Sequence, residues 1–397
     1  MFGGIGSITR SDFKENGDMK IQLFKPKYRI EECLKEIREC LEIGWTGLGF
    51  KTVNFEEAWK QYTGLKNAHY LNSSTIGLDM AVEICKMEYG WNDDDEIITT
   101  PITFVSTNHA ILRNKMRPIF ADVDNSLNLN PQDVRRKITK HKTKAVMFVG
   151  LGGNTKNLRE IEDICTEYNL KLILDAAHMA GTHHIDGTLP GKDAEVIVYS
   201  FQAVKNCPTS DSGMICFKEK KLDGIVRKMS WLGIDKDTYA RSVNKDSVYK
   251  WKYDVEYIGH KAHGNSVTAS LGLVGLKYLD EDNAYRRKLA QIYDEEFKND
   301  NGNIKLITID KNCIPSRHLY QILVPNRDDL ILKLNENGIY PGVHYRDNTE
   351  YRMYSYAKGT CPYAKYVSEH VLSLPLHLDV TQEDVIKIAK IVKDNLK

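Results

Sequence analysis

The sequence has no excess of charge of either sign. Its 397 residues include 55 Lys and Arg and 54 Asp and Glu, so the formal net charge is +1. A strongly basic surface, typical of nucleic-acid-binding proteins, is therefore not expected. The sequence also has no apolar run of about 18 residues, the length that a membrane-spanning helix needs. We therefore expect neither a nucleic acid nor a membrane as a partner.

The sequence also shows no CxxC pair and no HExxH pattern, and a secretory leader is not expected. The eight cysteines form no CxxC pair, and a chain this long does not need disulfides, so free thiols in a cytoplasmic protein are expected. His260 and His263 are one helical turn apart, but no HExxH pattern accompanies them, and no metal is predicted. Residues 1–20 lack the pattern of a secretory signal and are interpreted as an N-terminal extension.

Apolar periodicity predicts an alternation of strands and helices over the first two thirds of the chain. Short apolar strands are predicted at 68–71, 96–100, 118–123, 144–149, 170–174 and 194–201. Helices are predicted at 30–43, 53–62, 77–87, 103–113, 131–139 and 158–168. This pattern is typical of an α/β fold with a mostly parallel sheet covered by helices on both faces.

The pattern changes after residue 264. Two long helices are predicted at 267–279 and 283–298, followed by a strand at 318–324 and helices at 328–336 and 385–393. We therefore predict a large domain over 21–284 and a smaller α+β domain over 285–397.

Four groups of residues that can take part in binding or catalysis follow predicted strands. Asp175 and Ser200 each end a strand, and Lys205 follows five residues after Ser200. Asn72-Ser73-Ser74-Thr75 precedes a predicted helix, where backbone N–H groups and hydroxyls can bind a phosphate. Pyridoxal phosphate (PLP) needs such a phosphate site, a lysine that forms an imine, and a carboxylate on its ring nitrogen. Individually, Asp175 could be a strand cap and Lys205 a solvated side chain.

A nucleotide-binding alternative rests on Gly150-Leu151-Gly152-Gly153, which also follows a strand. It lacks the GxGxxG spacing and the acidic residue that ends a second strand in dinucleotide-binding folds, so we interpret it as a loop.

The order of these motifs resembles the DegT/DnrJ/EryC1/StrS sugar aminotransferases, a family of fold type I PLP enzymes, from about residue 28 to the C-terminus. The motifs that carry the resemblance are Gly44-Trp45-Thr46-Gly47 with Phe55-Glu56, Asn72-Ser73-Ser74-Thr75, Thr103-Phe104-Val105-Ser106-Thr107, Asp175-Ala176-Ala177-His178, Ser200-Phe201 with Lys205, His344-Tyr345, Cys361-Pro362 with Ala364, and Leu374-Pro375-Leu376-His377.

The resemblance implies a role for each matching residue. Lys205 would form the imine with PLP and later move a proton, and Asp175 would bind the ring nitrogen. The other roles fall to residues around the ring, the phosphate and the substrate: His178 near the phenolic oxygen, Phe104 on the ring face, Ser74, Thr75 and Ser200 at the phosphate, Lys261 at the phosphate of a partner subunit, and Trp45, His344 and Tyr345 at the substrate.

The resemblance also implies a homodimer and a reaction. L-Glutamate would convert the cofactor to pyridoxamine phosphate, and the amine would pass to the keto group of a nucleotide-linked deoxyhexose. The loops at 150–153 and 210–213 depart from the family pattern, which keeps open a small phosphorylated ketone or a cyclitol ketone as acceptor. A sugar dehydratase is disfavoured because such relatives have histidine where this chain has Lys205. A non-catalytic PLP-binding regulator is disfavoured because Lys205, Asp175 and His178 are all present.

Overall fold

The computed structural model describes residues 20–235, 253–298 and 302–396. Its centre is a seven-stranded sheet, in which the expected parallel α/β architecture is confirmed. The strands follow the spatial order β1 (His69–Leu71), β8 (Gly213–Phe217), β7 (Val196–Ser200), β5 (Lys171–Asp175), β4 (Thr143–Val149), β2 (Glu96–Thr99) and β3 (Arg117–Phe120).

Five neighbouring strands of this sheet, from β7 to β3, are parallel, whereas β8 pairs antiparallel with both β7 and β1. The parallel strands are almost wholly buried because helices cover both faces. Their carboxyl ends therefore meet at one edge, where side chains that follow different strands come together.

The helices that cover the large sheet lie close to the predicted residue ranges. They are α1 (Ile30–Ile43), α2 (Phe50–Thr63), α3 (Ser74–Tyr89), α4 (Val105–Arg113), α5 (Pro131–Lys137), α6 (Leu158–Glu167) and α7 (Lys220–Met229). The sequence reasoning did not anticipate β8 or α7.

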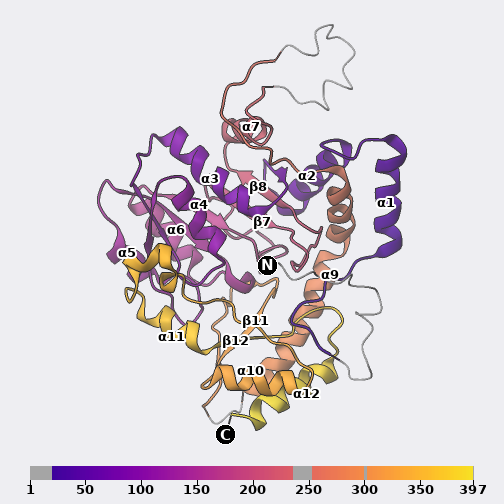
Figure 1. Cartoon of the computed structure of the whole chain (residues 1–397), viewed down its shortest axis with the longest axis vertical. Helices are drawn as coiled ribbons and strands as arrows, with labels where there is room; N and C mark the ends of the chain where they lie inside the picture. The colour runs from indigo at the N-terminus through magenta and orange to yellow at the C-terminus, as the bar shows by residue number, and fades with distance from the viewer. Residues whose placement is uncertain (1–19, 236–252, 299–301, 397) are drawn as a thin grey trace, which may run out of the picture.

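The prediction of two helices at 267–279 and 283–298 is wrong, because one helix, α9 (Ser266–Phe297), spans both. The polar residues between them do not end the helix, because they bind other elements. Asp280 accepts a hydrogen bond from Tyr62, and Asp282 pairs with Arg29. Figure 1 shows α9 running from the region of α1 and α2 down to α12.

The lower part of the molecule in Figure 1 is built on a smaller sheet of order β12-β11-β9. Its elements are β9 (Lys305–Leu306), β11 (Tyr320–Leu323), α10 (Arg327–Glu336), α11 (Pro362–His370), β12 (Val371–Leu374) and α12 (Gln382–Asp394). Two further short strands, β6 (His183–His184) and β10 (Cys313–Ile314), pair with each other. Ile21 joins this part through a bridge to Ile339. The division into domains near residue 285 falls inside α9 and stays a prediction.

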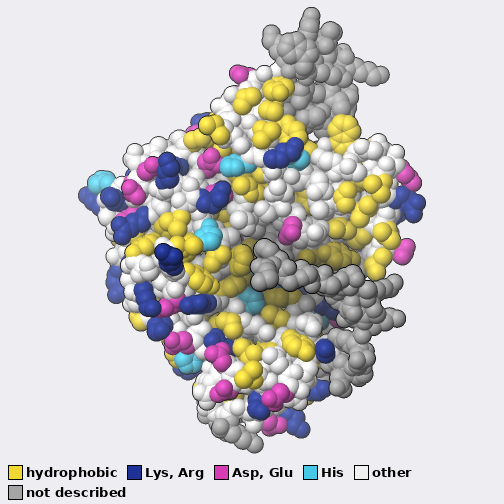
Figure 2. Space-filling view, viewed as in Figure 1, with side chains coloured by type: hydrophobic (Ala, Val, Ile, Leu, Met, Phe, Trp, Pro, Cys, Tyr) yellow, Lys and Arg dark blue, Asp and Glu magenta, His cyan; other side chains and the backbone are white. Residues whose placement is uncertain are grey.

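The surface agrees with the balanced composition. Basic and acidic side chains are interspersed over the face shown in Figure 2. Every helix in the described part of the chain is too short or too polar to cross a membrane.

Candidate functional site

A cavity of about 400 Å³ opens at the carboxyl edge of the large sheet. It brings together residues that are far apart in the sequence. Of the predicted site residues, it is lined by Ser74, Thr75, Phe104, Asp175, His178, Ser200, Lys205, His344 and Tyr345. Trp45 and Lys261 do not line it. Nine of the eleven predicted residues therefore share one cavity.

Lys205 lies just beyond β7 in a tight turn, with its backbone N–H bonded to the carbonyl of Gln202. Burial lowers the pKa of its amine to about 8, and the nearby Asp175 carboxylate opposes this effect. About one tenth of the amine is therefore unprotonated at pH 7, far more than for an ordinary lysine, and a nucleophilic lysine needs this form.

Asp175 is the last residue of β5 and is buried. One oxygen accepts a hydrogen bond from the Thr107 hydroxyl at 2.8 Å, and the other accepts the Ala177 N–H at 3.1 Å. Burial raises the pKa of this carboxyl above its ordinary value, although both hydrogen bonds and Lys205 lower it in part. A cationic group in the cavity would stabilise its ionised form.

The first turn of α3 forms one wall of the cavity. Ser73 caps the helix, because its hydroxyl accepts the N–H of Ile76. Among the described residues, the backbone N–H groups of Ser74 and Thr75 have no acceptor. Gly213 allows β8 to lie against this turn, because a Cβ there would come within 2.6 Å of the Ser74 nitrogen. These free donors at a helix N-terminus fit a phosphate group.

His178 is held as a neutral ring with a defined tautomer. The Gly152 N–H donates to its Nδ1 at 3.2 Å, so the ring proton lies on Nε2. Burial, with help from Lys205 and His344, places the pKa of His178 well below its ordinary value. Nε2 lies 3.4 Å from the Tyr345 hydroxyl. His178 can therefore donate a hydrogen bond from Nε2 to an oxygen in the cavity.

His344 and Tyr345 enter the cavity from the loop after α10. His344 Nδ1 lies 3.0 Å from the Ser373 hydroxyl, and burial together with Lys205 lowers the pKa of His344 to about 4. Phe104 stands at the N-terminus of α4, and 59% of its surface is exposed. Its ring centroid lies 6.2 Å from that of Tyr345. An exposed ring at a cavity wall is suited to stacking on a planar ligand.

The two remaining predicted residues lie elsewhere. The Trp45 indole N–H donates to the Leu48 carbonyl at 2.5 Å. The Lys261 amine lies 3.1 Å from the centre of the Trp231 ring. The predicted roles of Trp45 at the substrate and of Lys261 at a partner's phosphate stay predictions.

The sequence reasoning missed several residues of the site. Thr107 binds Asp175, and it belongs to a motif that had been recognised without a role for this residue. The His318 ring lies 4.3 Å from that of His178, and its Nδ1 is 3.0 Å from the Asn206 side-chain oxygen. No local pattern marks His318. It lies just before β11, and the fold places it beside the large sheet, where its N–H binds the Gly152 carbonyl. The cavity wall also includes Ser73, Thr103, Ser106, Gln202, Asp211 and Ser212.

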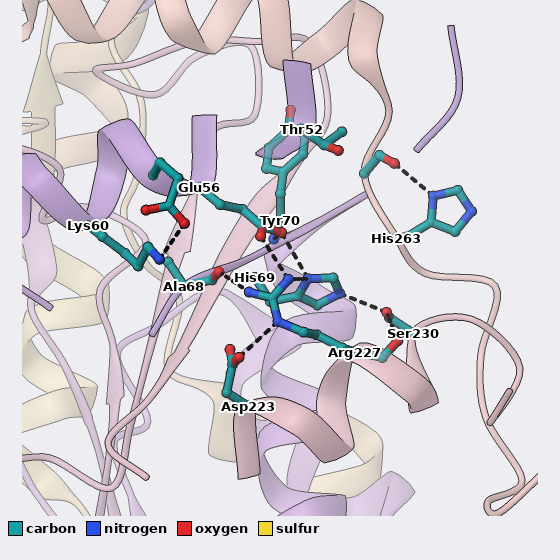
Figure 3. Close-up of polar contacts among 12 residues, drawn as sticks. Thr52, Glu56, Lys60, Ala68, His69, Tyr70, Asp223, Arg227, Ser230 and His263 are labelled. Carbon is teal, nitrogen blue, oxygen red and sulfur yellow. Dashed lines mark hydrogen bonds and ion pairs between the residues drawn. The ribbon is translucent and has the colours of Figure 1, made fainter. Parts of the chain in front are cut away.

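Glu56, part of a recognised motif, does not line the cavity and lies in a buried polar cluster (Figure 3). One of its oxygens lies 2.9 Å from His69 Nδ1 and accepts the Tyr70 N–H, and the other accepts a bond from Arg227 at 2.8 Å. His69 Nε2 in turn lies 2.7 Å from the Ser230 hydroxyl. Burial would raise the pKa of Glu56, but these contacts outweigh it and lower the pKa to about 2. The cluster anchors β1, which leads directly into the turn at Ser73.

Glu56→Gln is expected to destabilise the fold by about 3 kcal/mol, because the amide NH2 group would face either the Arg227 guanidinium or the Tyr70 N–H, both of which are donors. The pKa of Glu56 is lower in the folded chain than its ordinary value of 4.5. Its stabilising effect is therefore complete above pH 4.5 and is lost as the pH falls towards 2. Urea unfolding at several pH values measures both effects. Glu57→Gln, at an exposed neighbour, is the control; equal stability of the two variants would contradict the prediction.

The model of the DegT/DnrJ/EryC1/StrS aminotransferase family matches residues 27–393. The chain belongs to this family. The resemblance seen in the motifs is thereby confirmed, as is the fold type I architecture.

Relatives of this chain are named aminotransferases. It is 32% identical to the dTDP-4-dehydro-2,3,6-trideoxy-D-glucose 4-aminotransferase of Saccharopolyspora spinosa, over 93% of this chain and 95% of that protein. It is 30% identical to a UDP-4-amino-4,6-dideoxy-N-acetyl-beta-L-altrosamine transaminase of Campylobacter jejuni, over 88% of this chain and 89% of that protein. Helicobacter pylori PseC, an aminotransferase of pseudoaminic acid biosynthesis, superposes with a TM-score of 0.85 at 26% identity, covering 95% and 99% of the two chains.

The chain is therefore a PLP-dependent aminotransferase, and its cavity fits that cofactor. The free N–H groups of Ser74 and Thr75 suit the phosphate, and buried Asp175 suits a protonated ring nitrogen. The amine of Lys205 faces the same space. When bound, PLP supplies the electron sink for amine exchange.

Proposed function

We propose that this enzyme moves an amino group from L-glutamate to the keto group of a nucleotide-linked deoxyhexose, as a homodimer in the cytoplasm. The observation that carries the chemistry is the cavity shared by Lys205, Asp175 and the free N–H groups of α3. The sugar class is supported by the S. spinosa and C. jejuni relatives, whose names state nucleotide-linked sugar substrates.

Each residue has a separate task in this proposal. Lys205 removes the proton from the donor carbon that bears the amino group, and in the second half-reaction it supplies a proton to the acceptor carbon that receives the amino group. Its lowered pKa allows both steps near neutral pH. Asp175 keeps a positive charge on the ring nitrogen of the bound cofactor. His178 donates to the phenolic oxygen through Nε2, and His344 and Tyr345 orient the substrate beside Lys205.

The test is a two-step half-reaction. The purified enzyme with PLP is treated with glutamate, freed of excess donor and challenged with separate ketones. Return of the original absorbance band reports acceptance by nucleotide-linked 3-keto or 4-keto hexoses, dihydroxyacetone phosphate or a keto-cyclitol. We expect a nucleotide sugar to restore the band. If only dihydroxyacetone phosphate or the keto-cyclitol restores the band, the proposed sugar substrate is wrong. The altered loops at 150–153 and 210–213 would then be the determinants of substrate choice.

The homodimer is supported by apolar side chains at the surface of α1. Ile30, Leu34, Leu41 and Ile43 are exposed, and Figure 2 shows yellow side chains where Figure 1 places this helix. Such a patch is typical of a protein interface. Sedimentation of the purified enzyme tests this part, and a monomer at micromolar concentration would contradict it.

Uptake of PLP by the cofactor-free enzyme is expected to accelerate as the pH rises through about 8, because the Lys205 amine then loses its proton. About one tenth of the amine is free one unit below the pKa and about nine tenths one unit above it. Stopped-flow absorbance measures the rate. Since the Asp175 carboxylate raises the pKa of Lys205, Asp175→Asn should move the inflection to lower pH. An unchanged inflection in that variant would contradict the coupling.

A further inference from the structure

A small void adjoins the active-site cavity, and Lys205 lines both. Its other walls include Phe24, Arg286, His318 and His377. The volume is about 10 Å³, which is room for a single water-sized group. A phosphate or sulfate, with four oxygens, is too large for this space.

Arg286 is a buried cation without a carboxylate of its own. It projects from α9, and only 7% of its surface is exposed. Although a guanidinium has five N–H donors, the hydrogen bond it makes among the described residues is a long one of 3.4 Å to the Asp282 carbonyl. Both carboxylate oxygens of Asp282 are bound by Arg29, at 2.6 and 2.7 Å. Burial and the charge of Arg29 lower the pKa of Arg286 to about 10, although Asp282 opposes them.

The other charges around the void do not compensate Arg286. Lys25 and Lys27 share Asp379, at 3.1 and 3.0 Å. The charged residues that line the void are Lys25, Lys27, Lys205 and Arg286 on the cationic side and Asp282 on the anionic side. A buried charge that lacks a partner is costly, and a bound anion would remove that cost.

We propose that this void binds a monovalent anion, either chloride or one oxygen of a carboxylate, through the guanidinium of Arg286. Because Lys205 lines the same void, the carboxylate can be that of the amino donor. Binding of the donor's carboxylate rests on the proposed transamination, whereas binding of chloride does not.

The first experiment compares the wild-type holoenzyme with Arg286→Met and Arg287→Met. Arg287 is the matched control, since it is the next residue of α9 and does not line the void. Addition of sodium chloride to a chloride-free buffer should raise the Tm saturably in the wild type and in Arg287→Met, because the folded state binds the ion. The saturable rise should be lost in Arg286→Met. If that variant does not fold, Arg286→Lys replaces it and should show a weaker chloride dependence.

Crystals soaked in sodium bromide give a direct second measurement. We expect an anomalous peak beside the Arg286 guanidinium in the wild type. If the Tm depends on chloride equally in all variants and no bromide is found at Arg286, the void does not bind chloride and holds water instead.

Kinetics distinguish the two sources of the anion. If the side-chain carboxylate of the donor glutamate enters the void, chloride raises the KM for glutamate without changing kcat. Arg286→Met then raises the KM for glutamate but not for alanine, which lacks that carboxylate. If a free ion occupies it, chloride raises the Tm and leaves the KM unchanged. If neither KM nor Tm responds to chloride or to Arg286→Met, the proposal is wrong. Should the enzyme not transaminate at all, the Tm and bromide measurements still decide whether the anion site exists.

Discussion

Replacing Lys205 with alanine is expected to abolish the PLP adduct that borohydride traps and to lower kcat/KM by about 10²–10⁴-fold or more. In the proposed mechanism, this side chain supplies both the amine that bonds the cofactor and the group that moves the proton. Its buried position and its pKa of about 8 suit both tasks. Mass spectrometry of the reduced, digested protein measures the adduct, and the half-reaction measures the turnover.

The control for this variant is Lys218→Ala, which removes an exposed lysine just beyond β8. It should retain both the adduct and the activity. A borohydride-stable adduct on another lysine of Lys205→Ala, with turnover close to wild type, would refute the assignment.

Asp175→Asn is expected to retain the adduct but to lower the rate of transamination by about 10²-fold. A hydrogen bond to a charged partner contributes about 1.5–3 kcal/mol, and each 1.36 kcal/mol corresponds to a tenfold change in rate. The amide keeps the shape of the side chain but cannot stabilise a positive charge on the ring nitrogen. Single-turnover absorbance with excess glutamate measures this rate.

Thr107→Val provides a graded companion to that variant. It removes the 2.8 Å hydrogen bond that orients Asp175 while keeping the carboxylate. Its rate should therefore fall between those of the wild type and Asp175→Asn. Turnover of Asp175→Asn within twofold of the wild type would remove Asp175 from the mechanism.

Most strands and helices of the large sheet were predictable from local patterns, which are periodic in the helices and continuously apolar in the buried strands. The strand that ends at Asp175 and the strand that ends at Ser200 are continuous apolar runs, as expected for strands covered on both faces. The long helix α9 was not predictable as one element, because its central acidic residues look like a break. Only their partners Tyr62 and Arg29, more than 200 residues away in the sequence, explain why the helix continues.

The candidate site was likewise predictable from the sequence only in part. The motifs placed Lys205, Asp175, His178 and the α3 turn, since these residues follow strand ends or begin a helix. Two contacts of His178 escaped prediction. They are the Gly152 N–H that sets its tautomer and the His318 ring beside it, and both come from loops and strands brought close by the fold.

The sequence by itself determined the kind of sheet, the family and most of the predicted residues that the cavity brings together, because each depends on local patterns or on short motifs. The tertiary structure alone decided the electrostatics. The burial that lowers the pKa of Lys205, the cluster that holds Glu56 and the uncompensated charge of Arg286 all arise between distant segments. Desolvation and charge pairing depend on distances in space, and a linear pattern does not contain these distances.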